Sequence, residues 1–245
     1  MTGDRPSGRV RRQTRRSVLR QAGRVVLLCV AAGCRCDSQV AQKPNEDYDT
    51  AERRQRAAFE MGHWVRARVE RTSDLVASLG LRPGDVVADI GTGVGYLLPY
   101  LAARVGPQGV VIAEDIFPDF LAKAQEKIDA AGWRNVRTVL GSERDPKLPA
   151  NQLDVALLLD TYHHLNYPAE TLRHIRRALK VRGQLIIVEY YRSRKHPGAS
   201  AEDLRSHIRL DRDEVVAEVS AHGFRLARQF DHLPHEYVLK FGRTK

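Results

Sequence analysis

From Asp85 onward, short apolar runs alternate with longer segments whose apolar residues recur every three or four positions. The short runs are typical of buried strands, and the longer segments are typical of amphipathic helices. The predicted strands are 85–90, 109–114, 136–140, 153–159, 184–190, 224–230 and 236–241, and the predicted helices are 94–105, 118–131, 168–180 and 211–222. This alternation predicts an α/β fold with a doubly wound, largely parallel sheet.

The two ends of this pattern differ. The first strands are nearly continuous apolar runs, as expected of parallel strands that helices cover on both faces. The last two strands, 224–230 and 236–241, are separated by a short loop. Their proximity predicts an antiparallel hairpin at one edge of the sheet.

The chain divides into three segments. Residues 1–36 form a basic leader, residues 37–80 form a linker and N-terminal helices, and residues 81–245 form the α/β domain. The linker, 37–46, is polar, and the helical prediction for 47–80 rests on an apolar stripe that ends before Gly80. The stripe consists of Trp64, Val65, Val69, Leu75, Val76 and Leu79.

The positive charge of the chain is concentrated in the leader. Residues 1–36 contain nine arginines and a single acidic residue, Asp4, while the formal net charge of the whole chain is +10. The rest of the chain is therefore nearly neutral. Because a phosphate-binding groove needs its basic residues on the folded domain, this distribution argues against a nucleic-acid partner.

The leader resembles an export signal. Residues 14–20 read TRRSVLR, which is similar to the twin-arginine motif, and an uncharged apolar run from Val25 to Gly33 follows. That run is too short to span a bilayer and suits a signal peptide. Small residues precede Cys34, as at a lipoprotein cleavage site, so a lipid anchor at Cys34 is the one membrane contact we expect. The leader predicts export to the bacterial cell envelope; if it does not function, the protein stays in the cytoplasm.

The first predicted strand runs into a glycine-rich loop, VVADIGTGVGY at 86–96. Asp89 lies near the end of the strand, and glycines alternate after it at positions 91, 93 and 95. Glycine lets a ligand approach the backbone closely at the carboxyl end of a strand. Dinucleotide-binding loops need a third glycine where Tyr96 stands, and no Walker motif follows. The spacing therefore favours a nucleoside cofactor without a pyrophosphate.

The second predicted strand ends in Glu114-Asp115-Ile116. A carboxylate at this position can accept hydrogen bonds from both hydroxyls of a ribose. Two adjacent acids leave the choice between them open. Asp115 is favoured because the apolar Ile116 follows it and would cover an adenine ring.

From about Leu79 to Phe241, the chain resembles the class I S-adenosylmethionine (SAM)-dependent methyltransferases. The resemblance rests on LRPGDVVADIGTGVGYLLPYLA at 81–102, VGPQGVVIAEDI at 105–116, LDVALLLDTYHHL at 153–165 and LRHIRRALKVRGQLIIVEYY at 172–191. Within the class, the chain is most similar to small, often exported bacterial enzymes of uncertain substrate. The resemblance implies a Rossmann-like, doubly wound, seven-stranded sheet whose last strand is antiparallel, and SAM as the cofactor.

The resemblance also implies where the cofactor binds. By position, the glycine loop would hold the methionine part of SAM, Asp115 the ribose, and the segment after the third strand the adenine. The implied cofactor-binding residues are Asp89, Gly91, Gly93, Gly95, Asp115, Ile116, Ser142, Glu143 and Asp160. The chain departs from many relatives at Ser142-Glu143, where they have an aspartate after the glycine.

The candidate catalytic residues are Tyr162, His163 and His164, just after the fourth strand. A histidine there can take a proton from an oxygen or nitrogen nucleophile. The alternative is that the histidine pair only shapes the loop. Residues 189–191, at the end of the fifth strand, face the same rim as candidate substrate contacts.

The sequence predicts no metal site. The α/β domain has no cysteine, and the side chains of two adjacent histidines, His163 and His164, are not expected to converge on one ion.

Two functions fit these residues. The first is a methyltransferase that transfers the sulfonium methyl of SAM, by in-line displacement, to an unidentified small-molecule or protein acceptor. The second is a non-catalytic protein of the cell envelope that binds SAM or a nucleoside, or serves as a scaffold. Export favours the second, because SAM is made in the cytoplasm. We expect residues 47–64 and 192–210 to shape the acceptor pocket.

Overall fold

The computed structural model describes residues 39–194 and 200–244, and for residues 62–71 and 201 it describes the backbone alone. The leader predicted at 1–36, with its export motif and Cys34, lies outside the described residues. So do the side chains of three members of the predicted apolar stripe, Trp64, Val65 and Val69. Within the described part, none of the helices combines the length and the apolar character that crossing a membrane requires.

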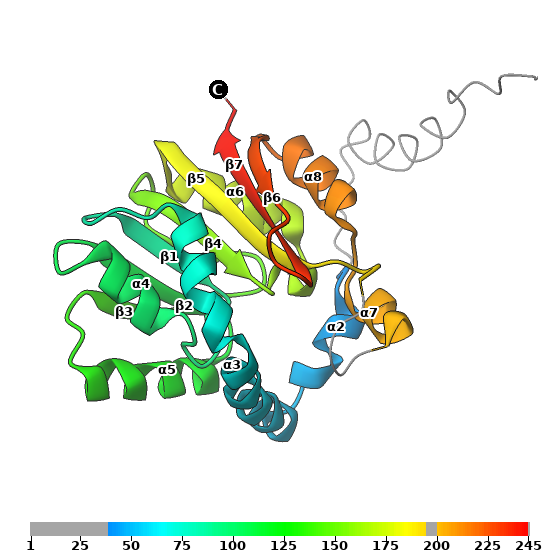
Figure 1. Cartoon of the computed structure of the whole chain (residues 1–245), viewed down its shortest axis with the longest axis horizontal. Helices are drawn as coiled ribbons and strands as arrows, with labels where there is room; N and C mark the ends of the chain where they lie inside the picture. Colours follow the sequence, from blue (N-terminus) through cyan, green and yellow to red (C-terminus); the bar gives the residue numbers. More distant parts are fainter. Residues whose placement is uncertain (1–38, 195–199, 245) are drawn as a thin grey trace, which may run out of the picture. The chain divides into compact units, whose positions relative to one another are not determined.

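Seven strands form one mixed sheet in the order β3-β2-β1-β4-β5-β7-β6 (Figure 1). The strands are β1 (Val86–Ile90), β2 (Val110–Asp115), β3 (Val136–Leu140), β4 (Leu153–Leu159), β5 (Leu179–Tyr190), β6 (Phe224–Phe230) and β7 (Glu236–Arg243). β7 is antiparallel to both of its neighbours, β5 and β6, and the other strand pairs are parallel. The predicted seven-stranded, doubly wound sheet with an antiparallel last strand is confirmed.

Helices precede the sheet and connect its strands. They are α2 (Gln42–Asn45), η1 (Glu46–Tyr48), α3 (Ala51–Leu79), α4 (Leu98–Val105), α5 (Pro118–Ala131), η2 (Tyr162–His164), α6 (Pro168–Ala178), α7 (Ala201–His207) and α8 (Arg212–Ala221). Helix α4 begins four residues later than predicted, because Gly93 and Gly95 have φ values of 56° and 76°, which no α-helix accommodates. α2 lies within the predicted linker, and α7 was not predicted.

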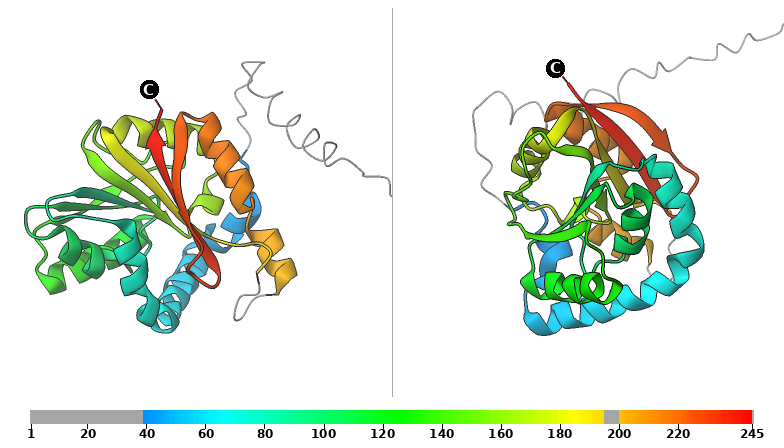
Figure 2. Two further views of the ribbon diagram at one scale, coloured as in Figure 1. Left: turned by 45° about the horizontal axis from the view of Figure 1, so that its top comes forward. Right: turned by 90° about the vertical axis from the view of Figure 1, so that its left-hand side faces the viewer.

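The two faces of the sheet carry separate hydrophobic cores. Alternate residues of β1 illustrate this: Val87 packs in the core formed with α3, α4 and α5, while Ala88 packs in the core formed with α6 and α8. This alternation follows from the two-residue period of a strand. Figure 2 shows the sheet between these two groups of helices.

The strand order reverses at β1, and this reversal positions the site. From β1 the chain moves outward through β2 to β3, then returns to β4 on the other side of β1. In such sheets, ligands bind outside the carboxyl ends of the strands at the reversal. Ile90, the last residue of β1, pairs with Glu114 of β2 and Leu158 of β4. The three strands therefore end at nearly the same level.

We expect Leu157→Ala to destabilise the protein by about 2–5 kcal/mol, because Leu157 is fully buried in β4 at the centre of the sheet. Val181→Ala is the matched control, since Val181 is 82% exposed, and it should change the free energy of unfolding by about 0.5 kcal/mol or less. Urea denaturation measures both. Equal losses in the two variants would contradict the assignment of the core.

Candidate active site

A pocket of about 430 Å³ lies at the carboxyl ends of β1, β2 and β4. Its lining comes from the glycine loop after β1, the end of β2, the segments after β3 and β4, the end of β5, and a wall made by η1, α3 and the end of α7. The wall residues include Tyr48, Met61 and Ile208. Both segments predicted to shape the acceptor pocket contribute to this lining, through residues 48, 57, 60 and 61 and through residues 204, 207 and 208.

The glycine loop packs tightly against the segment that follows β4. Gly91 has a φ of 71°, and a Cβ atom there would lie 2.4 Å from Cγ2 of Thr161. Any other residue would be strained and would push these two loops apart. The Thr92 hydroxyl donates a hydrogen bond of 2.7 Å to Oδ2 of Asp89, which fixes that carboxylate beneath the loop.

Asp115 ties the glycine loop to the end of β2. Its Oδ2 accepts a hydrogen bond of 2.8 Å from the backbone N–H of Gly93, and its Oδ1 accepts one of 3.0 Å from the backbone N–H of Phe117. Glu114 points elsewhere: it accepts a hydrogen bond from the N–H of Gly91, and a Cβ atom at Gly141 would collide with it. Both acids line the pocket, so the preference for Asp115 as the ribose ligand stays a prediction.

The pocket is strongly acidic. Its lining contains six carboxylates and, among the described residues, no lysine or arginine. The six are Glu60, Asp89, Glu114, Asp115, Glu143 and Asp160. Burial raises the pKa of Asp89 to about 6, with the Thr92 hydrogen bond opposing the shift and the charge of Asp115 adding to it. Burial also raises the pKa values of Glu114 and Asp115. Such a lining favours a ligand that carries positive charge.

Asp160 follows β4 directly and has a φ of 50°, a left-handed conformation that is uncommon outside glycine. Its backbone N–H donates a hydrogen bond of 2.9 Å to the carbonyl of Val188 on β5. This bond holds the strained residue at the pocket, where strain of this kind is often found.

Most of the predicted site residues line this pocket. Those that do are Asp89, Gly91, Gly93, Asp115, Ile116, Ser142, Glu143, Asp160, His163 and His164. Gly95 and Tyr162, which were also predicted, are not part of the lining. Gly95 faces α4 and α5, where a Cβ atom would lie 2.7 Å from Leu98. Tyr162 is buried in the core on the α6 and α8 face, and its hydroxyl donates a hydrogen bond of 2.6 Å to Glu218.

The N-terminal segment forms one wall of the pocket. Tyr48 of η1 stacks on Phe117 with ring centroids 6.0 Å apart and meets His164 edge-on at 5.1 Å. Arg54 of α3 forms an ion pair of 2.7 Å with Asp119 at the start of α5. These contacts join residues far apart in sequence, so no local pattern indicated them.

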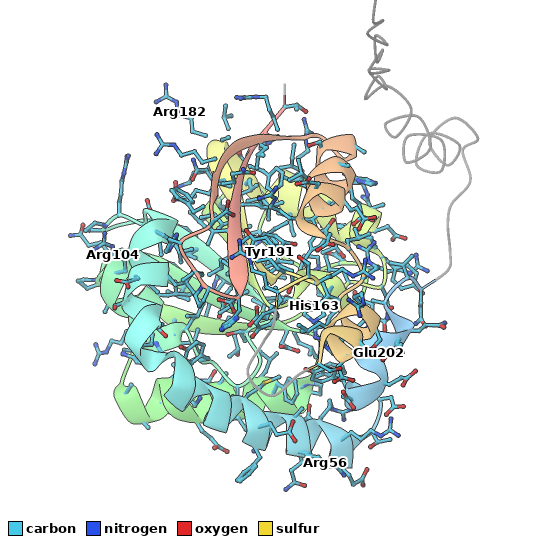
Figure 3. All side chains as sticks on the ribbon, turned by 45° about the vertical axis from the view of Figure 1, so that its right-hand side comes forward. Arg56, Arg104, His163, Arg182, Tyr191 and Glu202 are labelled. Atoms are coloured by element: carbon cyan, nitrogen blue, oxygen red, sulfur yellow. The ribbon has the colours of Figure 1, made fainter. Side chains whose placement is uncertain are left out.

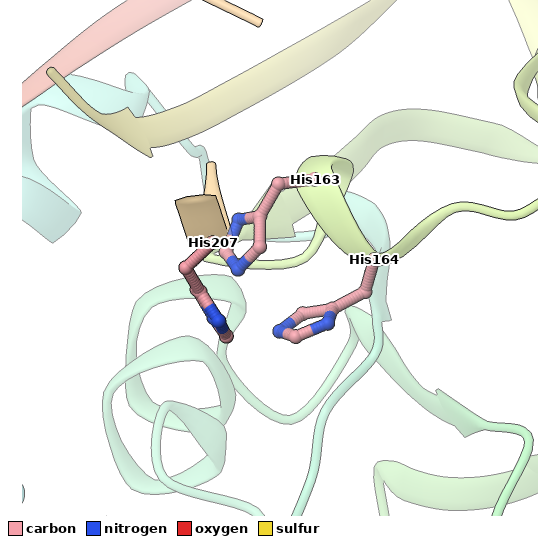
Figure 4. Close-up of side chains that lie close together, drawn as sticks. All are labelled: His163, His164 and His207. Carbon is pink, nitrogen blue, oxygen red and sulfur yellow. The ribbon is translucent and has the colours of Figure 1, made fainter. Parts of the chain in front are cut away.

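Next to this wall, three histidines form a cluster (Figure 4). The ring centroids of His163 and His164 are 4.0 Å apart, and those of His163 and His207 are 4.9 Å apart. The expectation that adjacent histidines cannot converge is wrong, because both lie in the tight 3₁₀ turn η2. His207 comes from α7 and was missed. Figure 3 shows His163 in the interior near α7, with Arg182 well away from it.

Two hydrogen bonds orient the adjacent histidines. Nδ1 of His163 lies 2.6 Å from Oε2 of Glu189, and Nδ1 of His164 lies 2.9 Å from Oδ1 of Asn45. Asn45 is a site residue that sequence reasoning did not find. Burial, with the neighbouring His163 and His207, lowers the pKa of His164 well below its ordinary value, so its ring is neutral.

The three predicted substrate contacts at the end of β5 lie in different surroundings. Glu189 is buried and holds His163, whereas Tyr190 lines the pocket. Tyr191 packs edge-on against Tyr237 at 5.1 Å, and its hydroxyl donates a hydrogen bond to Asp231. Of the three residues, the pocket lining therefore includes Tyr190.

Comparison with known proteins agrees with this geometry. A family profile described as a methyltransferase domain matches residues 88–185. A ubiquinone/menaquinone biosynthesis C-methyltransferase, UbiE, of Ectopseudomonas mendocina is 31% identical over 112 residues, which cover 45% of this chain and 44% of that protein. The chain thus spans less than half the length of this relative. UbiE of Yersinia enterocolitica is 27% identical, with 77% of this chain and 81% of that protein covered.

Solved structures extend the similarity to the fold. A SAM-dependent methyltransferase from Aquifex aeolicus is similar with a TM-score of 0.66 and 27% identity, covering 71% of this chain and 92% of that one. The family profile, these relatives and the similar structure together support a class I SAM-dependent methyltransferase. The family profile and the similar structure indicate SAM as the cofactor.

Asp89→Asn should stabilise the SAM-free protein above about pH 6. The pKa of Asp89 rises from 3.8 to about 6 on folding, so between these values the folded state holds more protons than the unfolded state. The contribution of Asp89 to the free energy of unfolding therefore falls as pH rises through this window. Since one pKa unit corresponds to about 1.4 kcal/mol, the variant gains up to about 3 kcal/mol.

Thermal unfolding of both proteins above about pH 6 and below pH 3.8 measures this effect. The gain in Tm should be present in the first condition and absent in the second. Asp129→Asn, an exposed position on α5, is the control and should change neither value. A variant that is less stable above pH 6 would contradict the raised pKa.

Proposed function

We propose that the protein transfers the methyl group of SAM to a small-molecule acceptor that enters the pocket beside the histidine cluster. The observation that carries this proposal is the lining of the pocket: six carboxylates and, in the described chain, no basic side chain other than histidine. A phosphate-bearing cofactor would be repelled there. A cofactor with a positively charged sulfur and an amino group is attracted.

The residues present fit SAM. Asp115 offers a carboxylate at the end of β2, where ribose hydroxyls can donate to it. Asp89 and Asp160, beside the glycine loop and the end of β4, suit the ammonium group. The apolar Ile116 and Phe117 offer a surface for the adenine ring. Bound SAM supplies a methyl group on a sulfonium, which a nucleophile takes by in-line displacement.

The acceptor end differs from the cofactor end in its side chains. Tyr48, Leu204 and Ile208 form apolar walls, and the histidine cluster supplies polar nitrogens. In the metal-free protein, neutral ring nitrogens accept hydrogen bonds, so the acceptor meets them with a group that donates a proton. Walls on η1 and α7 favour a small molecule with an apolar body over a side chain on a protein surface.

The relatives support the same reading. The curated relatives named above act in quinone biosynthesis, according to their names, and quinones are small molecules with apolar rings. The non-catalytic alternative is disfavoured, because a scaffold has no need of a pocket that runs from the glycine loop to a polar cluster. What this chain's residues contribute is positioning: they orient the acceptor toward the cofactor and exclude water.

Asp115→Ala should weaken SAM binding by about 10- to 100-fold, because it removes charge-assisted hydrogen bonds worth about 1.5–3 kcal/mol. Calorimetric titration of the full chain with SAM measures the change. Asp129→Ala, at an exposed position on α5, should bind like the wild type.

A second ligand separates ribose binding from loop disturbance, since Asp115 also holds Gly93. An S-adenosylhomocysteine analogue without the ribose hydroxyls should bind the wild type more weakly than S-adenosylhomocysteine does. The Asp115→Ala variant should not distinguish the two ligands. If it discriminates as strongly as the wild type, Asp115 does not hold the ribose.

Formation of S-adenosylhomocysteine should depend on the low-molecular-mass fraction of a bacterial extract and not on its protein fraction. Leu204→Trp fills the acceptor end, because Leu204 lines the pocket from α7. It should lower the rate of S-adenosylhomocysteine formation about tenfold or more and leave the affinity for SAM unchanged. Glu202→Trp, on the exposed face of α7, is the control. Methyl transfer into the protein fraction alone would rule out a small-molecule acceptor.

A further inference from the structure

The three histidines converge more closely than their role as a pocket wall requires. One ring nitrogen from each of His163, His164 and His207 lies within 4.8 Å of the corresponding nitrogen of the others. His163 is 4% exposed, and the other two are half-buried. Figure 4 shows a nitrogen of each ring facing the space between them. Three imidazoles directed at one point are a recurrent arrangement for a metal ion.

The hydrogen bonds around the cluster fix which nitrogens are available. Nδ2 of Asn45 donates a hydrogen bond of 3.0 Å to the carbonyl of His164, so Oδ1 of Asn45 is an acceptor. Nδ1 of His164, 2.9 Å from that oxygen, must therefore be the donor. A neutral ring that is protonated on Nδ1 carries its lone pair on Nε2. This lone pair points away from Asn45.

Glu189 fixes the orientation of the His163 ring in the same way. Its Oε2 lies 2.6 Å from Nδ1 of His163 and 3.2 Å from the backbone N–H of the same residue. Because a carboxylate only accepts, Nδ1 donates, and Nε2 of His163 is left with its lone pair. Metal-binding histidines almost always donate their second ring nitrogen to a carboxylate or a carbonyl oxygen. Both of these histidines already have that outer partner.

We propose that His163, His164 and His207 bind a divalent transition metal ion, Zn²⁺ in particular. Imidazole is a preferred ligand of zinc, copper, iron and nickel. Three protein ligands with an open fourth position are typical of catalytic rather than structural zinc sites. The acidic pocket adds a negative potential that attracts a cation.

The site joins two separate parts of the chain. His163 and His164 belong to η2, and His207 is the last residue of α7. Nitrogens bound to zinc at about 2.0–2.1 Å lie about 3.3 Å from one another in a tetrahedral site. Metal binding therefore draws the rings together by about 1.5 Å or less and fastens α7 over the pocket. The open position faces the same pocket, where it would hold the reacting heteroatom of the acceptor; this last point alone rests on the proposed function.

The test uses the full chain, stripped of metal with a chelator and titrated with Co²⁺, whose visible absorption reports tetrahedral nitrogen ligation. One equivalent should produce the absorption, and Zn²⁺ should displace it. His163→Ala, His164→Ala and His207→Ala should each abolish it. His174→Ala is the matched control, because His174 is half-buried on α6, is paired with Asp145 at 3.2 Å, and lies outside the pocket lining. No absorption with the wild type, or absorption that survives all three substitutions, would overturn the proposal.

Two further variants keep the test decisive if a histidine variant does not fold. Asn45→Ala should weaken Co²⁺ binding about 10- to 100-fold, because it removes the outer partner of His164. Asn45→Asp keeps an oxygen that accepts from Nδ1 and should restore binding; equal binding by both variants contradicts the proposed orientation. SAM calorimetry on the stripped protein tests the proposed function separately from the metal site. A protein that binds SAM but does not bind Co²⁺ would overturn the metal site alone.

Discussion

The buried carboxylate of Asp115 is the contact on which the pocket depends. It accepts the N–H groups of Gly93 and Phe117 and so joins the glycine loop after β1 to the turn that leads into α5. An ion at this depth is stable only when it is hydrogen-bonded or paired with opposite charge. The backbone supplies the hydrogen bonds, and a cationic cofactor supplies the charge. Fold and cofactor are therefore coupled through one residue.

Local features of the sequence predicted the parts of the site that local geometry determines. The apolar runs located the strands, and the glycine spacing located the loop, because both depend on consecutive residues. Gly95 lies against α4 and α5 and not in the pocket lining, and the sequence could not indicate this, since three alternating glycines have the same appearance whether a ligand or a helix approaches them. Tyr162 lies in the core and not in the pocket lining, because the residues after β4 turn sharply in η2.

Contacts between distant segments were beyond the reach of the sequence. Asn45 and His207 are separated from His164 along the chain, and nothing in their neighbourhoods indicates a common site. The short helices α2 and α7, which carry them, have no long apolar period. The leader is a different case. Its twin-arginine-like motif and Cys34 predict export, and both lie outside the described residues.

In the proposed function, the carboxylate end of the pocket binds the cofactor and the histidine end binds the acceptor. The carboxylate end comes from the sheet and its loops, which the resemblance to relatives covers. The histidine end comes partly from α7, and η1 and α3 close a side wall, so these segments give the acceptor site its particular shape. Residues 88–185, the part that matches the family profile, contain five of the six carboxylates of the pocket and two of the three histidines.

A crystal structure of the full chain with S-adenosylhomocysteine tests the central claim most directly, because it locates both ends of the pocket at once. We predict that the ribose hydroxyls contact Asp115, the amino acid part lies by Gly91 and Asp160, and the sulfur faces His163. A ligand bound outside the carboxyl ends of β1, β2 and β4, or bound there with its sulfur turned away from the histidines, would contradict this account.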